Sequence, residues 1–128
     1  MIYGIGTDIV QVSRMEDNLA RHGDRFAERI LSDSELAVFS SHTRPAHFLA
    51  KRFAAKEAAA KAFGTGFSDG LSLRHIVVAN EDSGRPTLQF VETAQSLAQQ
   101  FKITGSFLSL SDEKDYAVAF VVLEKAPV

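Results

Sequence analysis

Cysteine and tryptophan are absent from the sequence, and only three of its 128 residues are proline. Without cysteine the chain forms no disulfide, offers no thiolate to a metal and has no thiol nucleophile. No uninterrupted apolar run approaches the roughly 20 residues that a membrane-spanning helix needs, and the first residues, MIYGIGTD, lack the basic and apolar regions of a signal peptide. The net charge of −2 provides no overall basic field for nucleic acid or a membrane surface. We therefore expect a cytoplasmic protein that binds neither nucleic acid nor membranes.

What is present suits one globular domain over residues 1–128, since 45% of the residues are hydrophobic and 23% are charged. Helices and strands are partly segregated along the chain, which favours an α+β fold over a doubly wound parallel sheet. We expect the last two strands to pair antiparallel. The predicted elements are a strand at 2–10, helices at 13–22, 25–31, 32–40 and 45–63, strands at 74–79 and 87–90, a helix at 92–101, and strands at 106–110 and 116–123.

Several predicted helices carry signals at their ends. Ser13 and Ser32 are each followed three residues later by glutamate, which is the capping-box pattern of a helix N-terminus. For the long helix at 45–63, Pro45 suits the first turn and Gly64 suits the C-terminal end.

That long helix combines an alanine-rich surface with four charges. Between residues 52 and 63 it reads RFAAKEAAAKAF, so Arg52, Lys56, Glu57 and Lys61 stand among alanine and phenylalanine. Glu57 and Lys61 are four residues apart, which allows a surface ion pair. The alternative is that Glu57 lies against packed elements, where a carboxylate is costly unless it is paired or bound to a metal.

Asp8 is a second carboxylate in an apolar setting. It lies at the end of an apolar strand and is followed by Ile9 and Val10, although aspartate is disfavoured inside strands. One interpretation is a turn or helix-cap residue, but Ser13 already offers a cap. The other interpretation pairs Asp8 with Glu57 as two hard oxygen ligands. Such a pair suits Mg²⁺, which binds through one or two carboxylates, waters and substrate phosphate oxygens.

The turn Gly64-Thr65-Gly66 follows the long helix directly. It is at least a helix stop. Its backbone N–H groups could also face a phosphate, with the positive charges of Arg52, Lys56 and Lys61 just upstream. The four histidines show no metal-ligand spacing, and neither a Walker motif nor a Gly-x-Ser-x-Gly elbow is present.

A basic series runs through the first third of the chain, at Arg14, Arg21, Arg25 and Arg29. Arg14 and Arg21 are seven residues apart and share a helix face. Acidic residues dilute the charge, so a solvated helix face is the default interpretation. The alternative is a docking surface for an acidic partner.

Three of these segments resemble the holo-acyl-carrier-protein synthases, the short bacterial 4′-phosphopantetheinyl transferases. They are GIGTDIV at 4–10, FLAKRFAAKEAAAKA at 48–62 and GTG at 64–66. The resemblance covers essentially the whole chain. It implies an α+β 4′-phosphopantetheinyl transferase-like fold, with an antiparallel sheet packed against a long central helix. It also implies a homotrimer with active sites at the subunit interfaces, coenzyme A as donor, apo-acyl carrier protein as acceptor and Mg²⁺ as metal, in fatty acid biosynthesis.

The resemblance also implies roles for individual residues. Asp8 and Glu57 become the metal ligands, and Glu57, directly or through a metal-bound water, is the candidate base. Lys61 offsets charge on the leaving group and, like the turn Gly64, Thr65 and Gly66, contacts coenzyme A phosphates. Arg52 becomes a nucleotide contact. The first helix, with Arg14 and Arg21, becomes the dock for the carrier protein.

The chain departs from the family pattern at Asp112, where many members have histidine, and at Phe53, where many have tryptophan. The role of that histidine does not transfer. Two rival functions remain at this point. One is a metal-dependent nucleotide phosphohydrolase that uses the same carboxylates. The other is a non-enzymatic module whose basic helix binds an acidic protein.

Overall fold

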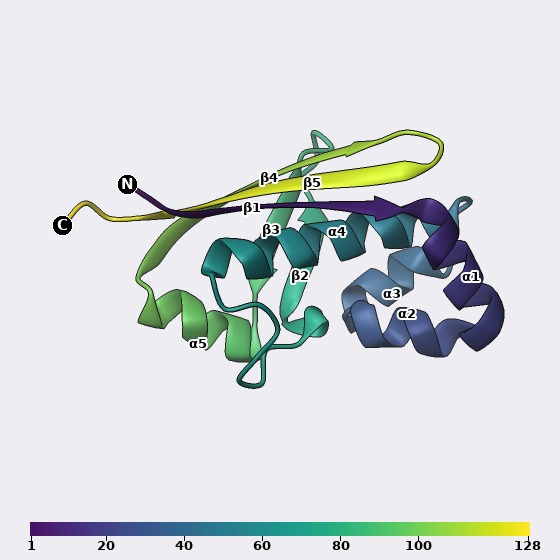
Figure 1. Ribbon diagram of the computed structural model, residues 1–128, viewed down its shortest axis with the longest axis horizontal. Helices are drawn as coiled ribbons and strands as arrows, with labels where there is room; N and C mark the ends of the chain where they lie inside the picture. Colours follow the sequence, from purple (N-terminus) through teal and green to yellow (C-terminus); the bar gives the residue numbers. More distant parts are fainter.

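A three-stranded antiparallel sheet packed on one long helix forms the body of the molecule (Figure 1). The computed structural model describes residues 1–128. The sheet has the strand order β1-β5-β4, with β1 at Ile2–Gln11, β5 at Tyr116–Lys125 and β4 at Ile103–Asp112. Helix α4, at Pro45–Phe63, runs across one face of this sheet. The predicted α+β fold, with an antiparallel sheet on a long central helix, is confirmed.

Smaller elements flank the long helix. Three helices gather where β1 ends, namely α1 at Val12–His22, α2 at Asp24–Ile30 and α3 at Asp33–Phe39. The strands β2, at Ile76–Asn80, and β3, at Pro86–Phe90, form a separate two-stranded sheet. Helix α5 follows at Glu92–Gln100. The strand predicted to begin at residue 74 begins later because Leu73–His75 forms a 3₁₀ turn. None of the helices combines the length and the apolar character that a bilayer span requires.

Glycine on the strand and alanine on the helix bring β1 and α4 into close contact. A Cβ at Gly4 would overlap the carbonyl of Ala62, and a Cβ at Gly6 would overlap the carbonyl of Ala58. Only residues without long side chains permit this approach of one backbone to another. Side chains alternate along a strand, so Asp8 lies on the same face as Gly6 and points toward α4.

The two predicted capping boxes had different outcomes. At α3 the box is complete, because the Glu35 N–H donates to Ser32 Oγ at 3.4 Å and the Ser32 N–H donates to Glu35 Oε1 at 2.9 Å. The box at Ser13 was wrong, since α1 begins one residue earlier and has no side-chain cap. There the Val12 N–H donates to the Asp115 carbonyl at 2.8 Å, so the β4–β5 turn takes up a backbone group at the strand-to-helix junction.

Candidate active site

Asp8 and Lys61 meet where β1 crosses α4. The Lys61 ammonium donates to Asp8 Oδ1 at 3.1 Å and to the Thr7 carbonyl at 2.9 Å. The Asp8 side chain is 17% exposed and that of Lys61 is 53% exposed, so the pair lies at a partly open surface. The surface pair between Glu57 and Lys61 that the four-residue spacing allows is not formed. Lys61 reaches across to the strand instead.

Glu57 lies one turn before Lys61 and faces the same site. Burial raises the pKa of its carboxyl group, and the negative charge of Asp8 raises it further, while Lys61 and Arg14 act in the opposite direction. The Asp8 charge acts on Glu57 because the two carboxylates are close in space. Glu57 itself makes no ion pair within the chain. The structure therefore brings together the two carboxylates that were 49 residues apart in the sequence.

The donor set at this site fits a hard divalent cation. Two carboxylates repel each other, and a cation between them would remove that repulsion. Nowhere in the chain do three or more aspartate, glutamate or histidine side chains gather into a closed metal cage. Two carboxylates are nevertheless sufficient for Mg²⁺, because Mg²⁺ retains waters and takes substrate phosphate oxygens as further ligands.

The turn at residues 64–66 ends α4 and leaves two of its backbone N–H groups without a hydrogen-bond partner. Gly64 and Gly66 have φ of 83° and 61°, which favours glycine at both positions. The Gly64 N–H is used within the helix end, on the carbonyls of Ala60 and Lys61. The N–H groups of Thr65 and Gly66 do not take part in the backbone hydrogen bonds of the turns and loops. These two N–H groups are therefore the ones that can face an anion.

Arg52 and Lys56 lie on another side of α4, in the protein interior. The Lys56 ammonium is fully buried and donates to Glu35 Oε1 at 2.6 Å, to the Ile30 carbonyl at 2.8 Å and to the Leu73 carbonyl at 3.0 Å. The suggestion that Lys56 supplies charge to a phosphate was wrong, because all three of its donors are occupied inside the core. Burial lowers the pKa of Lys56 to about 8 although Glu35 acts to raise it.

Arg52 shares Glu35 with Lys56. Its guanidinium donates to Glu35 Oε2 at 3.2 Å, to the Val78 carbonyl, and to Asn80 Oδ1 at 3.3 Å. The side chain is only 10% exposed, yet it borders a cavity of about 200 Å³ together with Asn80. The structure does not bring Arg52 to Asp8, so its predicted contact with a nucleotide would be made at a different point of the surface.

Glu35 is the residue that sequence reasoning missed. It was recognised only as a capping partner, although it is 1% exposed and holds both Arg52 and Lys56. Its two oxygens also accept the Ser32 and Val78 N–H groups. The available signal was the presence of two cations on one alanine-rich helix, since buried cations require an acidic partner.

The first helix presents its arginines to solvent. Arg14 and Arg21 are both exposed on α1, and Arg14 is close enough to influence the pKa of Glu57. Arg21 also lines a hollow of about 260 Å³, the basic hollow, with His22, Arg25, Phe26 and Arg29. The predicted docking surface thus begins beside the carboxylate site and continues onto α2.

Asp112, the departure from the family pattern, lies at the end of β4. Its Oδ1 is 3.8 Å from the ammonium of Lys51, and both side chains are about one-third exposed. An exposed pair at that distance contributes little to stability.

Comparisons with known proteins agree over nearly the full length of the chain. A family model described as the 4′-phosphopantetheinyl transferase superfamily matches residues 4–121. The holo-[acyl-carrier-protein] synthase of Halorhodospira halophila is 55% identical over 123 residues, which are 96% of this chain and 98% of that protein.

Solved structures give the same result. The crystal structure of the holo-[acyl-carrier-protein] synthase from Neisseria meningitidis aligns with a TM-score of 0.93 and 44% identity, over 98% of this chain and 100% of that one. The holo-(acyl-carrier-protein) synthase from Bacillus anthracis, solved in complex with CoA (3′,5′-ADP), aligns with a TM-score of 0.82 and 41% identity, over 98% and 99% of the two chains.

Proposed function

The chain belongs to the 4′-phosphopantetheinyl transferase superfamily, and from that membership and the site on α4 we propose that it is a holo-[acyl-carrier-protein] synthase. It transfers the 4′-phosphopantetheine group from coenzyme A to a serine hydroxyl of apo-acyl carrier protein and releases adenosine 3′,5′-bisphosphate. The single observation that carries this proposal is the meeting of Asp8, Glu57 and Lys61 at one partly open site.

Asp8 and Glu57 are the residues that would hold Mg²⁺. When bound, the cation supplies positive charge to the pyrophosphate of coenzyme A and helps to orient it for in-line attack. Burial and then the negative charge of Asp8 raise the pKa of Glu57, and this influence of one carboxylate on the other supports the assignment. The Lys61 ammonium pairs with Asp8, and the Lys61 side chain remains 53% exposed, so a bound substrate could contact it.

The transfer makes one bond and breaks one. The serine oxygen bonds to the phosphorus that carries the pantetheine group, and the bond from that phosphorus to the bridging oxygen breaks, so that the nucleotide leaves with the electron pair. Lys61 stabilises the negative charge on the leaving group. The serine proton passes to Glu57, directly or through a water. Glu57 suits this role because it faces the site and has no ion-pair partner within the chain.

Other parts of the surface would hold the two substrates. The free N–H groups of Thr65 and Gly66, in the turn that begins at Gly64, support contact with coenzyme A phosphates. The cavity beside Arg52 and Asn80 supports contact of Arg52 with the nucleotide. Arg14 and Arg21 on α1 would dock the acidic carrier protein, and the influence of Arg14 on Glu57 supports a dock beside the site of transfer.

We also propose a single transferase domain over residues 1–128 that assembles as a cytoplasmic homotrimer with active sites at the subunit interfaces. The sheet face turned away from α4 supports assembly, because it exposes a row of large apolar side chains. These are Ile5, Ile9, Phe107, Val118 and Phe120, each between 37% and 61% exposed. An uncovered apolar sheet face of this kind is typical of an interaction surface. Light scattering that finds a fully active 14.0 kDa monomer would exclude the trimer.

The decisive experiment is mass spectrometry of apo-carrier protein after incubation with coenzyme A, Mg²⁺ and this protein. We expect the mass of the carrier to increase by one phosphopantetheine group, and we expect a chelator to prevent the increase. Breakdown of coenzyme A at the same rate without carrier protein would favour a phosphohydrolase instead. A stable complex with the carrier protein but no turnover would favour a binding module.

A further inference from the structure

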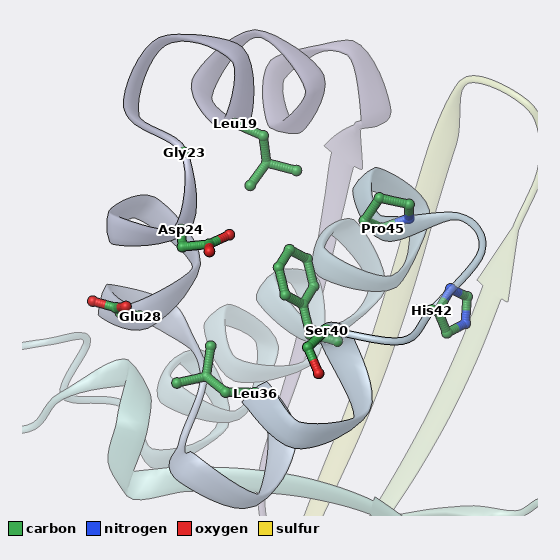
Figure 2. A pocket seen from close by; sticks show the side chains of 9 residues that line it. Leu19, Gly23, Asp24, Glu28, Leu36, Ser40, His42 and Pro45 are labelled. Carbon is green, nitrogen blue, oxygen red and sulfur yellow. The ribbon is translucent and has the colours of Figure 1, made fainter.

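A cavity of about 520 Å³ lies away from the proposed active site, among α1, α2, α3 and the start of α4. It is twice the size of the neighbouring basic hollow, which has about 260 Å³. Its volume falls within the roughly 300–1,000 Å³ that is usual for small-molecule sites. Figure 2 shows the helices around it, with Leu19, Asp24 and Leu36 on different elements.

The inner part of the cavity is apolar. Leu19 from α1 and Leu36 and Phe39 from α3 contribute the apolar lining, and Phe39 is 9% exposed. Leu19 is five residues after Arg14, so it lies on the opposite side of α1 from the proposed carrier dock. A ligand with an apolar body would remove this lining from water.

The rim of the cavity is acidic. Asp24 and Glu28 stand on successive turns of α2, and neither forms an ion pair. In Figure 2 the Asp24 carboxylate points toward the space between Leu19 and Leu36, whereas that of Glu28 points outward. No lysine or arginine lines the cavity, because the arginines of α2 face the basic hollow on the other side of the helix.

We propose that this cavity binds small organic cations that carry an apolar body, such as arylalkylammonium ions. The ammonium group pairs with Asp24, and the apolar body packs against Leu19, Leu36 and Phe39. Anions are disfavoured because both carboxylates repel them and neither lysine nor arginine lines the site, whose one imidazole, His42, lies across the cavity from Asp24. An inorganic cation would leave the apolar lining uncovered. This proposal does not depend on the proposed transfer reaction, so the binding test can be decided whether or not the protein transfers phosphopantetheine.

The test is a titration of the ¹⁵N-labelled protein with 3-phenylpropylammonium at neutral pH, followed by NMR. We expect shifts of backbone amides concentrated at residues 19–28 and 36–42, with a dissociation constant on the order of 1 mM for a ligand of this size. Two control compounds separate the contributions. 3-Phenylpropionate has the same body and the opposite charge, and propylammonium has the charge without the ring. Both should bind several-fold more weakly.

Two variants complete the test. Asp24→Asn should weaken 3-phenylpropylammonium binding several-fold, whereas Asp82→Asn, which removes an exposed carboxylate from a distant turn, should leave it unchanged. The proposal is overturned if 3-phenylpropionate binds equally well or if Asp24→Asn has no effect. Shifts centred on Asp8 and Glu57 would overturn it too, because the ammonium would then be bound by the other carboxylate pair.

Discussion

Helix α4 carries two groups of charges that are adjacent in sequence but differ in their burial and in their partners. Lys56 belongs to an interior cluster with Glu35 and Arg52, whereas the next residue, Glu57, belongs to a partly open cluster with Asp8 and Lys61. Consecutive residues of a helix point about 100° apart, so Lys56 is directed toward α3 and Glu57 toward β1.

The difference lies in how completely the charges are satisfied. In the interior cluster every buried side-chain nitrogen and oxygen has a hydrogen-bond partner. In the open cluster Glu57 has no ion-pair partner, and a second carboxylate stands nearby. A satisfied buried cluster holds elements together. A site with unsatisfied like charges is destabilised in isolation and is typical of a place where a ligand binds.

The largest effect should come from Glu57→Gln in the open cluster. It removes both a metal ligand and the candidate base, so we expect kcat for phosphopantetheine transfer to fall by about 10²–10⁴-fold. The free energy of unfolding should not fall, because no ion pair is lost. Glu124→Gln, an exposed change on β5, is the matched control and should transfer at the wild-type rate. Near wild-type transfer by Glu57→Gln with Mg²⁺ present would contradict the site assignment.

The reverse pattern is expected for Lys56→Met in the interior cluster. It leaves Glu35 buried next to Arg52 alone, and removal of one partner of a buried pair costs about 3–5 kcal/mol. Urea denaturation measures this loss. Lys51→Met, on the same helix but at a side chain that is 38% exposed, should change stability by less than about 0.5 kcal/mol. The double variant Glu35→Gln/Lys56→Met should recover part of the loss, and if it does not, the two residues are not coupled as the contacts indicate.

The two carboxyl groups should titrate on opposite sides of the ordinary glutamate value of 4.5. Burial alone raises the pKa of Glu35, but the charge and hydrogen bond of Lys56 and two backbone N–H groups outweigh it, so its pKa is lowered. Its stabilising contribution is therefore present above pH 4.5 and is lost as the pH falls through the lowered pKa. The pKa of Glu57 is raised, so the folded state gains stability as the pH falls through that raised value toward 4.5.

Carbon-13 NMR of the glutamate carboxyl groups measures both values. Addition of Mg²⁺ should lower the apparent pKa of Glu57, because the cation favours the ionised form. The pKa of Glu35, which is enclosed in the interior, should not respond. Equal responses of the two groups to Mg²⁺ would remove the distinction between the clusters.

The smallest effect is expected at the proposed carrier dock on α1, from Arg21→Glu. Loss and reversal of one docking charge should raise KM for the carrier protein by about tenfold and leave kcat and KM for coenzyme A unchanged. Arg21 is a cleaner choice than Arg14, because Arg14 also acts on the pKa of Glu57. Lys102→Glu, an exposed change before β4, is the control for net charge. A parallel rise of both KM values would contradict a separate carrier dock.

Local sequence signals predicted the elements well where a single residue decides the backbone. Gly64 ends α4 in the left-handed region, and Ser32 caps α3. They failed at Ser13, where the N-terminus of α1 is determined by a hydrogen bond to Asp115, a residue more than 100 positions away. The last strands extend beyond the predicted ranges because pairing with β1 and with each other, rather than propensity, sets their length.

The sequence by itself determined the residues that can carry the chemistry, since two carboxylates, a lysine and a glycine turn were recognisable from residue type and family resemblance. Only the tertiary structure decided which of the four charges on α4 meet which partners. The glycines of β1 let the strand approach α4 closely, which puts Asp8 against Glu57 and Lys61. On the other side, Glu35 draws Arg52 and Lys56 into the core, because buried charges are stable only in contact with an opposite charge.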